Sequence, residues 1–485
     1  MKRILFIGYL TLLVSISCSS NGPSPEDLRP PKGGSDEDVV CSDYVTIGLN
    51  RKKDASVSEK LLGFNTVYAN NPDDIWSDGK LASAIKAVRP GFLRYPGGTV
   101  TTFYHWHSLT GNGWADSWDP SYNHKTDKNP SEFMNLDEYL SLIRKTGAEP
   151  MIGVNCNSAF VYDRLEDGIE EALSLMRYVK EKGFDVKYWF IGNEPFAKDG
   201  NGGTWTPAEY AEMVKAFAPK MKEFDPSIKI IVNDHANMVK NSWEYDKILS
   251  IAGQWIDVID MHWYWNHGSA TWQKWLNKTP CGISGGISYM DEVGAVRAMA
   301  AKNGYPDIEV ATLEWNCGPS TDAEEPFKTA GQMTLVQGEM IMQFMLGGLD
   351  MACFWPLFWN GDYSQRGFID KNTRKLLPIS QVMKNFGEYQ GNTLVETSLN
   401  KSVNHLMVLA VADDDSDQIR IAVLNKNNYS IGVKLGGALA GNTRQVSVVS
   451  FHMNKDLSDI IMSDKETKDI DKIISLPYSL TFITL

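Results

Sequence analysis

Apolar and polar positions follow two different patterns along this chain. From Leu62 to about Gln390, short apolar runs alternate with longer stretches in which apolar residues recur every three or four positions. After about Gln390 the apolar runs are short, broken by Asp, Asn and Gly, and show little helical periodicity. The first pattern is typical of repeated strand–helix units, and the second indicates a small domain made of strands.

The first region contains eight candidate strands, each followed by polar or aromatic residues. They are residues 62–64, 92–94, 150–154, 188–191, 228–232, 258–261, 309–313 and 351–355. Helices are predicted between them, among others at 136–146, 169–182, 207–224 and 291–303. The predicted helix at 207–224 has clear signals for its amino-terminal end: Thr206 as N-cap, Pro207 at the first position and Glu209 completing a capping box.

Eight such units predict an α/β fold, namely a (β/α)8 TIM barrel with its active site at the carboxyl ends of the strands. A doubly wound sheet is set aside, because no glycine-rich phosphate turn follows the first strand at Leu62–Phe64.

The patterns divide the chain into four predicted segments. Residues 1–18 are a lipoprotein signal peptide, 19–40 a flexible linker, 41–390 the catalytic barrel, and 391–485 a small β-sandwich domain. Strands of the last domain are expected at 406–411, 419–424, 430–435, 444–451 and 476–485. The stretch Val45–Leu49 is predicted to pair with this domain and to close its edge.

The amino-terminal sequence has the pattern of a secretory signal peptide. Lys2 and Arg3 precede an apolar run, Ile4–Ile16, that is too short to span a bilayer as a stable helix. A small residue directly before Cys18 resembles the lipobox of bacterial lipoproteins, in which the cysteine is acylated; ordinary signal-peptide cleavage is the alternative. We therefore expect an envelope protein anchored to the outer membrane, on its periplasmic side or at the cell surface, and touching the membrane only through the lipid on Cys18.

Composition narrows the class of partner. Lys and Arg number 47 against 60 Asp and Glu, and the net charge of -13 repels phosphate backbones, so nucleic acid is not expected as a partner. The 15 Trp and 19 Tyr suit a large core or a surface that stacks on sugars, which favours a polysaccharide or oligosaccharide substrate. The six cysteines lack a CxxC spacing, so no structural zinc is expected, and neither a metal nor a cofactor is implied.

Two carboxylates carry the candidate chemistry. Glu194 follows the fourth predicted strand and Glu314 follows the seventh, so both are expected at the same mouth of the barrel. A glycosidase needs such a pair, because one carboxylic acid protonates the leaving oxygen while the other carboxylate attacks the anomeric carbon.

The residues around this pair carry a family resemblance. Asn193–Pro195 and Glu314–Asn316 resemble the acid/base and nucleophile signatures of the clan of retaining (β/α)8 glycosidases. Leu93–Gly98, followed by Tyr104–Trp106, is most similar to the α-L-arabinofuranosidase family. The resemblance implies that Glu194 is the general acid/base and Glu314 the nucleophile. It also extends to 207–233 and to 476–481 near the carboxyl terminus.

Other residues are expected to bind substrate or to hold the two carboxylates. Asn193 should hydrogen-bond the sugar hydroxyl next to the anomeric carbon, and Arg94 should keep Glu314 ionised by lowering its pKa. In the clan a His or Tyr from the sixth strand lies against the nucleophile, which points to His262 and Tyr264.

Aromatic and polar residues of the strand-end loops complete the predicted site. Trp355 and Trp359 would form the floor of the sugar subsite, with core packing as the alternative for each. His105, Trp106 and Asn155, on the loops after the second and third strands, would line the site.

The expected function is hydrolysis of a plant or algal polysaccharide with net retention, by an α-L-arabinofuranosidase-like enzyme. The chain departs from that family after the acid/base residue, at Pro195–Lys198, and in the aromatic run Phe354–Trp359, so the sugar stays open. A β-xylosidase, a β-glucuronidase or an endo-acting agarase-like enzyme is the alternative, and the tryptophans of 263–265 and 272–275 would suit an endo-acting cleft. A rival from another class is an inactive carbohydrate-binding lipoprotein, against which the paired carboxylates argue.

Overall fold

The structure is a computed structural model, and it describes residues 41, 44–71, 75–126, 133–195, 205–233, 238–266, 270–281, 287–318, 327, 329–359 and 364–485. The predicted signal peptide, the linker and Cys18 lie outside these residues. The described residues from Cys41 to Leu485 belong to one compact unit. In the part of the chain that is described, every helix is too short or too polar to cross a lipid bilayer.

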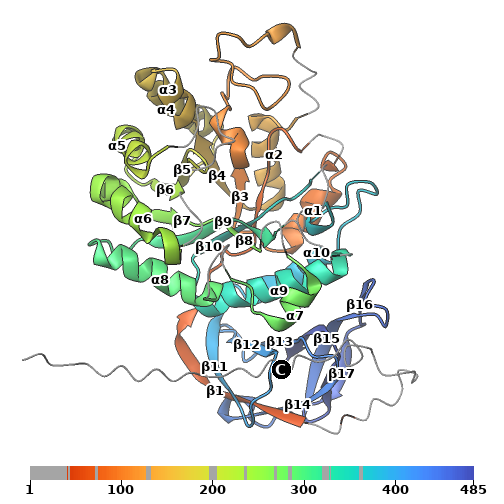
Figure 1. The fold of residues 1–485 in the computed structure, drawn as a ribbon. Helices are drawn as coiled ribbons and strands as arrows, with labels where there is room; N and C mark the ends of the chain where they lie inside the picture. The colour runs from red at the N-terminus through yellow and green to blue at the C-terminus, as the bar shows by residue number, and fades with distance from the viewer. Residues whose placement is uncertain are drawn as a thin grey trace, which may run out of the picture. The chain divides into compact units, whose positions relative to one another are not determined.

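Eight parallel strands form a closed barrel, as the alternating pattern predicts (Figure 1). They are β2 (Gly63–Asn65), β3 (Phe92–Tyr95), β4 (Glu149–Val154), β5 (Tyr188–Ile191), β6 (Lys229–Asn233), β7 (Val258–Asp260), β9 (Glu309–Cys317) and β10 (Met351–Phe354). The barrel closes because β10 pairs with both β2 and β9. One further strand, β8 (Trp263–Trp265), pairs with the distal end of β9 beyond β7.

Helices surround the barrel in chain order. The outer helices are α1 (Lys80–Ala87), α2 (Leu136–Thr146), α4 (Leu165–Glu181), α5 (Pro207–Phe224), α6 (Met238–Ala252), α8 (Tyr289–Lys302), α9 (Ala330–Gly347) and α10 (Ile379–Gly387), and the short helices α3 (Cys156–Val161) and α7 (Trp272–Asn277) precede α4 and α8. Short 3₁₀ turns occur at Gly98–Thr102, His124–Thr126, Gly253–Trp255, Ser364–Arg366 and Ala438–Ala440.

Local signals account for the helix boundaries. The capping box of α5 is present as predicted, with the Thr206 side chain accepting from the backbone N–H of Glu209 and the Glu209 side chain accepting from that of Thr206. Helix α8 starts two residues earlier than predicted, because Ser288 caps it by accepting from the backbone N–H of Asp291.

Side chains fill the barrel interior, so it is a packed core and not a channel. This inner cluster comprises Phe92, Met151, Tyr188, Phe190, Ile231, Val258, Ala311, Leu313, Met351 and Cys353. Cys156, Cys317 and Cys353 are buried free thiols. Because the interior is full, a substrate has access to the barrel only at its mouth.

The remaining strands form a second domain, as the second pattern predicts. One curled ten-stranded sheet contains β1 (Tyr44–Ser56), β11 (Thr393–Leu399), β12 (Leu406–Ala412), β13 (Ile419–Asn425), β14 (Ile431–Gly436), β15 (Gln445–Met453), β16 (Ile460–Met462), β17 (Glu466–Asp469), β18 (Ile473–Ser475) and β19 (Ser479–Thr484). Strand β1 pairs with this domain as expected, but it lies between β11 and β14 and not at an edge.

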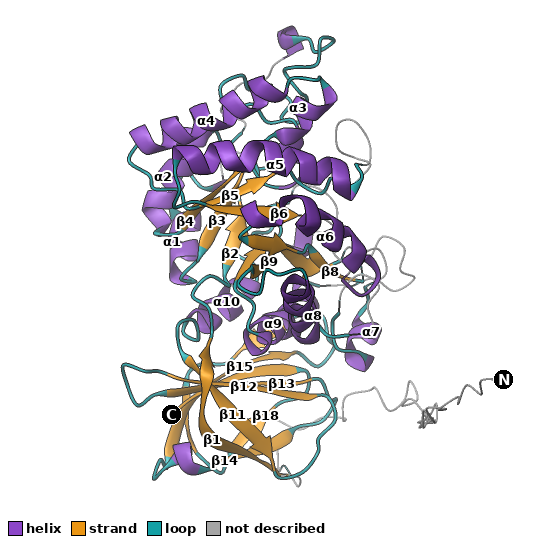
Figure 2. Ribbon diagram, turned by 90° about the vertical axis from the view of Figure 1, so that its left-hand side faces the viewer, coloured by secondary structure: helices purple, strands orange, loops and turns teal. Residues whose placement is uncertain are grey.

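Helix α9 lies between the barrel and this sheet (Figure 2). Its residues from Gly331 to Met345 are all buried, since one side faces the barrel and Gly338 on another packs against Leu480 of β19. The two domains therefore share a hydrophobic core, and the sheet supports the barrel on the side of α9.

Candidate active site

Glu194 and Glu314 lie together at the carboxyl ends of their strands. Glu194 follows β5 and Glu314 belongs to the last part of β9. One carboxylate oxygen of Glu194 and one of Glu314 lie within 4.8 Å of each other. Retaining glycosidases place their two carboxyl groups about 5–5.5 Å apart, whereas inverting enzymes need room for a water between them. The separation is closer to that of a double-displacement pair than to the wider one of inverting enzymes.

The Glu314 carboxylate is buried and accepts a hydrogen bond on each oxygen. Arg94 Nη1 donates to its Oε1 at 2.9 Å, and the Tyr264 hydroxyl donates to its Oε2 at 2.8 Å. Arg94 is fully buried at the end of β3, so this ion pair is shielded from solvent. Two charged or polar donors on one carboxylate hold its orientation, which a nucleophile needs.

The predicted effect of Arg94 on the pKa of Glu314 requires correction. Burial raises the pKa of Glu314 and is the largest influence; His262, Arg94 and the Tyr264 hydroxyl lower it, while the charge of Glu194 raises it. The net pKa is raised above the ordinary value and not lowered. Arg94 acts in the predicted direction, but its charge does not outweigh the loss of hydration.

Glu194 sits in a strained turn and is partly open to solvent. Its φ of 44° lies in the left-handed region, which costs a non-glycine residue about 1–3 kcal/mol and persists where neighbours enforce it. Asn233, at the end of β6, enforces it here by accepting from the Glu194 backbone N–H at 2.9 Å. The side chain is 25% exposed, compared with 6% for Glu314, so the two carboxyl groups have different environments.

His262 connects the two carboxylates. Its Nδ1 lies 2.7 Å from Glu194 Oε1 and 3.5 Å from Glu314 Oε2, and its Nε2 lies 3.1 Å from Asp260 Oδ2. Burial lowers its pKa, but the charges of Glu314 and Asp260 and the hydrogen bonds to Asp260 and Glu194 outweigh burial and raise the pKa to about 10. The ring is therefore a cation at neutral pH, closer to Glu194 than to the expected neighbour Glu314.

Glu194, His262 and Glu314 are close enough to one another to surround a metal ion. A protonated imidazole has no lone pair to offer, and both ring nitrogens of His262 already face carboxylates. Arg94 adds a second fixed cation beside Glu314. The chemistry of these side chains fits an acid–base pair better than a metal site.

Asn193 is held by the same arginine. Arg94 Nη2 donates to Asn193 Oδ1 at 2.7 Å, while its Nη1 also donates to Asn65 Oδ1 at 2.9 Å. Because the amide oxygen of Asn193 faces Arg94, its NH2 group faces the other way. That orientation presents a donor, which suits recognition of a sugar hydroxyl.

Three buried supporting residues were not predicted. Asn65 ends β2 and donates to the Leu313 carbonyl at 2.7 Å, Asn233 ends β6, and Asp260 ends β7 and accepts from the Leu313 backbone N–H at 2.7 Å. Their only sequence signal is a polar residue at the end of an apolar strand. That signal does not reveal which neighbour each one contacts.

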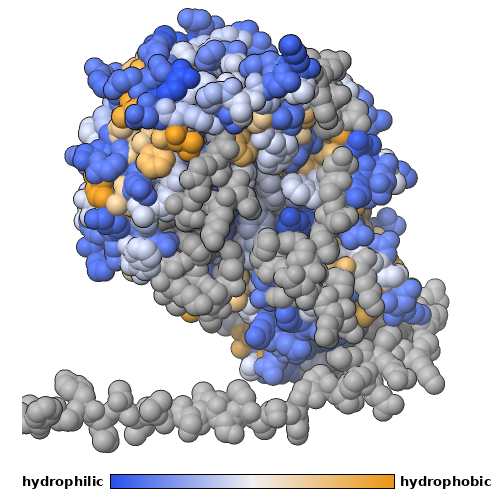
Figure 3. Space-filling model, turned by 45° about the horizontal axis from the view of Figure 1, so that its top comes forward, coloured by the Kyte–Doolittle hydropathy of each residue, from blue (hydrophilic) through white to orange (hydrophobic). Residues whose placement is uncertain are grey.

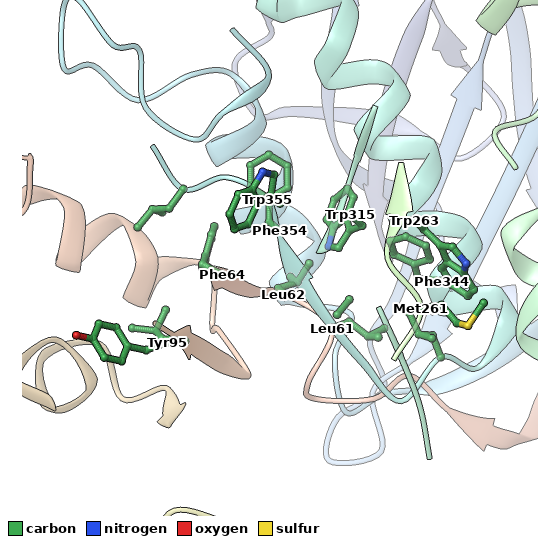
Figure 4. Packing of buried hydrophobic residues seen from close by; sticks show 14 of the residues in the cluster. Leu61, Leu62, Phe64, Tyr95, Met261, Trp263, Trp315, Phe344, Phe354 and Trp355 are labelled. Carbon is green, nitrogen blue, oxygen red and sulfur yellow. The ribbon is translucent and has the colours of Figure 1, made fainter. Parts of the chain in front are cut away.

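Trp355 lies at the carboxyl end of β10 (Figure 4). It is 9% exposed, and its ring covers Gly98, where an added Cβ would come within 2.4 Å of the indole. Gly98 also has a φ of 58°, so glycine is required there on two grounds. Trp359 is half-buried, and its ring centroid lies 6.3 Å from that of Trp355.

Three predicted lining residues make their contacts elsewhere. His105 lies between Glu171 and Asp116, at 2.7 and 2.9 Å. Trp106 donates to Ser174 of α4, and Asn155 caps α3. Among the described residues, the hydrogen bonds of His105, Trp106 and Asn155 go to these partners and not to Glu194 or Glu314. Their predicted contact with the substrate stays a prediction.

The tryptophans expected to suit a cleft are core residues. Trp263, Trp265, Trp272 and Trp275 are all buried, and the most exposed of them, Trp272, is only 7% exposed. Figure 4 shows Trp263 packed with Phe344 and Met261 inside the cluster. A run of tryptophans could signal either a core or a cleft, and burial decides for the core, so the argument for endo action fails.

Comparisons with known proteins agree with this geometry. Residues 84–280 match the family described as alpha-L-arabinofuranosidase 1 domain. The chain is 26% identical over 218 residues to alpha-L-arabinofuranosidase C of Emericella nidulans, covering 38% of this chain and 40% of the relative. It is 25% identical over 285 residues to intracellular exo-alpha-(1->5)-L-arabinofuranosidase 1 of Bacillus subtilis, covering 52% of each. These matches span about two fifths to one half of the relatives' lengths.

A solved structure extends the likeness to the fold of nearly the whole chain. The family 51 α-L-arabinofuranosidase of Thermotoga petrophila superposes with a TM-score of 0.70 at 18% identity, covering 91% of this chain and all of that one. The matched residues 84–280 include β3 to β8 and Glu194, whereas Glu314 lies beyond them. The chain is thus similar in sequence to α-L-arabinofuranosidases over residues 84–280, and it shares its overall fold with a solved member of that family.

Proposed function

We propose that this protein is a retaining glycoside hydrolase that removes α-L-arabinofuranosyl groups from plant oligosaccharides or polysaccharides. The observation that carries the proposal is the pair of carboxylates within 4.8 Å at one barrel mouth, one buried between donors and the other partly exposed. The names of the relatives support the choice of sugar.

The first step forms a glycosyl-enzyme. A Glu314 oxygen attacks the anomeric carbon and forms a C–O bond, while the bond from that carbon to the leaving oxygen breaks. Protonated Glu194 transfers its proton to the leaving oxygen, so the alcohol departs neutral and Glu194 becomes a carboxylate. The product of this step is an ester between the sugar and Glu314.

The second step releases the sugar. Glu194, now ionised, takes a proton from a water whose oxygen attacks the anomeric carbon, and the ester bond to Glu314 breaks. Glu194 is protonated again and Glu314 is a carboxylate again, so the enzyme returns to its starting state. Two inversions at the same carbon give net retention.

The surrounding residues serve these steps by position and charge. Arg94 and Tyr264 hold Glu314 and stabilise it as it leaves the ester in the second step. His262, a cation hydrogen-bonded to Glu194, favours the ionised form that Glu194 takes after giving up its proton. Asn193 presents its NH2 group to the sugar.

Other activities of the same scaffold are alternatives. A β-xylosidase, a β-glucuronidase or an agarase-like hydrolase could use the same two steps, since the fold alone does not choose the sugar. An inactive carbohydrate-binding lipoprotein is the rival of another class; two carboxylates within 4.8 Å of each other, one of them buried, carry a cost in free energy that a binder does not need.

Hydrolysis and covalent labelling test the proposal together. Purified protein should hydrolyse an aryl α-L-arabinofuranoside faster than the aryl β-xyloside and β-glucuronide. A 2-fluoro arabinofuranosyl inactivator should add its mass to the peptide that contains Glu314, and Glu314→Ala should lose both turnover and label. Less than a tenfold loss of turnover in Glu314→Ala would contradict the role of nucleophile, and binding without an adduct or hydrolysis would favour the carbohydrate-binding protein.

The role of Glu194 has its own test. Glu194→Ala should lose activity by at least about 10²-fold on substrates with poor leaving groups and much less on those with good ones, because protonation then matters less. Azide should restore turnover and give a glycosyl azide of retained configuration. An equal loss on all substrates, with no rescue, would refute the acid/base assignment.

We also propose that Cys18 is acylated and tethers the enzyme to the outer membrane through residues 19–40. The support is the basic start, the short apolar run and the small residue before Cys18. Growth with an alkyne-bearing fatty acid should label the wild-type chain and not Cys18→Ser, which should leave the membrane fraction. Label retained by Cys18→Ser would contradict acylation at Cys18.

A further inference from the structure

Large exposed apolar side chains are few in the described part of the chain. They are Trp114, Phe160, Leu165, Trp243, Met290, Leu376, Tyr429, Ile461 and Met462. The face turned forward in Figure 3 is correspondingly mostly hydrophilic, with small apolar patches among its described residues. Isolated exposed apolar residues are common on protein surfaces. We therefore consider a role in binding only for an exposed apolar residue that lies beside the active site.

Phe160 meets that condition. It is 39% exposed on α3, the short helix after β4, and its ring centroid lies 4.4 Å from that of Trp205, with the planes tilted by 41°. The Trp205 backbone N–H donates to the carbonyl of Pro195 at 3.0 Å, and Pro195 is the residue after Glu194. The aromatic pair is thereby joined to the turn that carries Glu194.

The Phe160–Trp205 pair lies on the Glu194 side of the site. Strands β4 and β5 are neighbours in the barrel, whereas Glu314 comes from β9, several strands away. In a retaining mechanism the acid/base residue protonates the leaving oxygen. The leaving group must therefore extend from Glu194, and the Phe160–Trp205 pair lies beside the turn that carries Glu194.

We propose that Phe160, supported from below by Trp205, is the stacking platform for the first sugar of the leaving group. This inference rests on the proposed function and adds to it a binding subsite for the main chain of the substrate. The apolar face of a pyranose matches the exposed face of one aromatic ring, and a rigid ring loses little entropy when it binds.

The scaffold holds Phe160 in place. Asn155 caps α3 by accepting from the Ser158 backbone N–H, and the Ser158 hydroxyl donates to Asp116. After the helix, Arg164 places its guanidinium 4.0 Å from the ring centroid of Trp118. A helix fixed at both ends can present an exposed ring without rearrangement on binding.

Charge near the platform favours one kind of sugar. Asp163, Glu166 and Asp167 are exposed close to Phe160 in the chain, and the nearby Arg164 is paired with Asp167 at 2.7 Å. The local excess of negative charge disfavours a uronate. The occupant is therefore a neutral sugar, such as a xylose or arabinose unit of the substrate chain.

Glycosyl fluorides separate this subsite from the catalytic steps, because fluoride leaves without occupying a sugar subsite. Phe160→Ala should reduce kcat/KM on neutral arabinose-substituted oligosaccharides by about tenfold. It should leave kcat/KM on α-L-arabinofuranosyl fluoride within about twofold of wild type. Phe160→Trp should retain activity on the oligosaccharides, and Trp243→Ala on α6, where the side chain is 57% exposed, is the matched control.

The outcomes distinguish the two proposals. If the wild type hydrolyses neither the fluoride nor the oligosaccharides, the proposed function fails. If the wild type hydrolyses both and Phe160→Ala changes neither, or lowers both equally, the platform is refuted while the enzyme assignment stands. Loss on the oligosaccharides alone, absent in Trp243→Ala, supports the platform.

Discussion

Arg94 is the residue that links the groups of the site. Its Nη1 and Nη2 together donate to Asn65, Glu314 and Asn193, and its guanidinium carbon lies 4.3 Å from the ring centroid of Phe190. A lysine has a single charged nitrogen and cannot reproduce a planar group that reaches three acceptors. The position therefore requires the shape of arginine as well as its charge.

Removing this charge should change the pH dependence of the enzyme. Arg94 lowers the pKa of Glu314, so Arg94→Gln should raise that pKa further and move the acidic limb of kcat/KM to higher pH. Arg94→Lys keeps the charge and should keep the limb closer to wild type, although both variants should lose activity. The measurement is kcat/KM from pH 3 to 8; an acidic limb unmoved in Arg94→Gln would contradict this role.

At the scale of elements, the loop between β3 and α2 is fastened to α4 by one buried histidine. His105 lies between Asp116 of the loop and Glu171 of α4, and stacks on Trp118 at 4.4 Å. Burial lowers the pKa of His105, but hydrogen bonds to Asp116 and Glu171 and their charges outweigh burial and raise it from 6.5 to about 9. The His105 ring thus binds its proton more tightly in the folded state than in the unfolded state.

The raised pKa of His105 predicts that the stability difference between the wild type and His105→Gln depends on pH. Protonated His105 contributes on the order of 3 kcal/mol to the free energy of unfolding. This contribution is complete below pH 6.5 and disappears as the pH rises through about 9, because His105 has then lost its proton in both the folded and the unfolded state. The free energy of unfolding of the wild type should exceed that of His105→Gln most at pH 6 and least at pH 9.5. Urea unfolding across this range measures it, and a constant difference would disprove the linkage.

At the scale of the whole molecule, a buried ion pair connects the barrel to the sheet domain. Lys426, after β13, donates to Glu339 of α9 at 3.1 Å and to the carbonyl of Lys278 at 3.0 Å, and Trp275 of α7 donates to the same carboxylate at 2.6 Å. Burial lowers the pKa of Lys426 and raises that of Glu339. In each case the opposite charge of the partner works against the effect of burial.

Removing one partner of this pair should be costly. Lys426→Met leaves Glu339 buried without its cation and should lower the free energy of unfolding by about 3–5 kcal/mol, while the double variant with Glu339→Gln should recover most of the loss. Activity of the folded protein on an aryl arabinofuranoside should stay unchanged in both. If Lys426→Met were as stable as the wild type in urea unfolding, the ion pair between Lys426 and Glu339 would not stabilise the fold as stated here.

The order of strands and helices and the two catalytic candidates could be predicted from the sequence, because they depend on local pattern. Period and caps place β2 to β7, β9, β10 and α5 along the chain, but not the short β8, and a carboxylate at the end of an apolar strand marks Glu194 and Glu314. The pairing of residues 45–49 with the second domain was predicted, but the place of β1 inside the sheet, between β11 and β14, was not.

Tertiary structure alone decided distances, burial and net charge effects. The closing of the barrel sets the separation of Glu194 and Glu314, buries Trp263 in the core, and directs His105 to Asp116 and Glu171. A polar residue at a strand end looks the same whether it contacts substrate, as expected for Asn193, or supports a neighbour, as Asn233 does. Sequence encodes local preference, whereas desolvation and hydrogen-bond partners depend on which strands become neighbours in space.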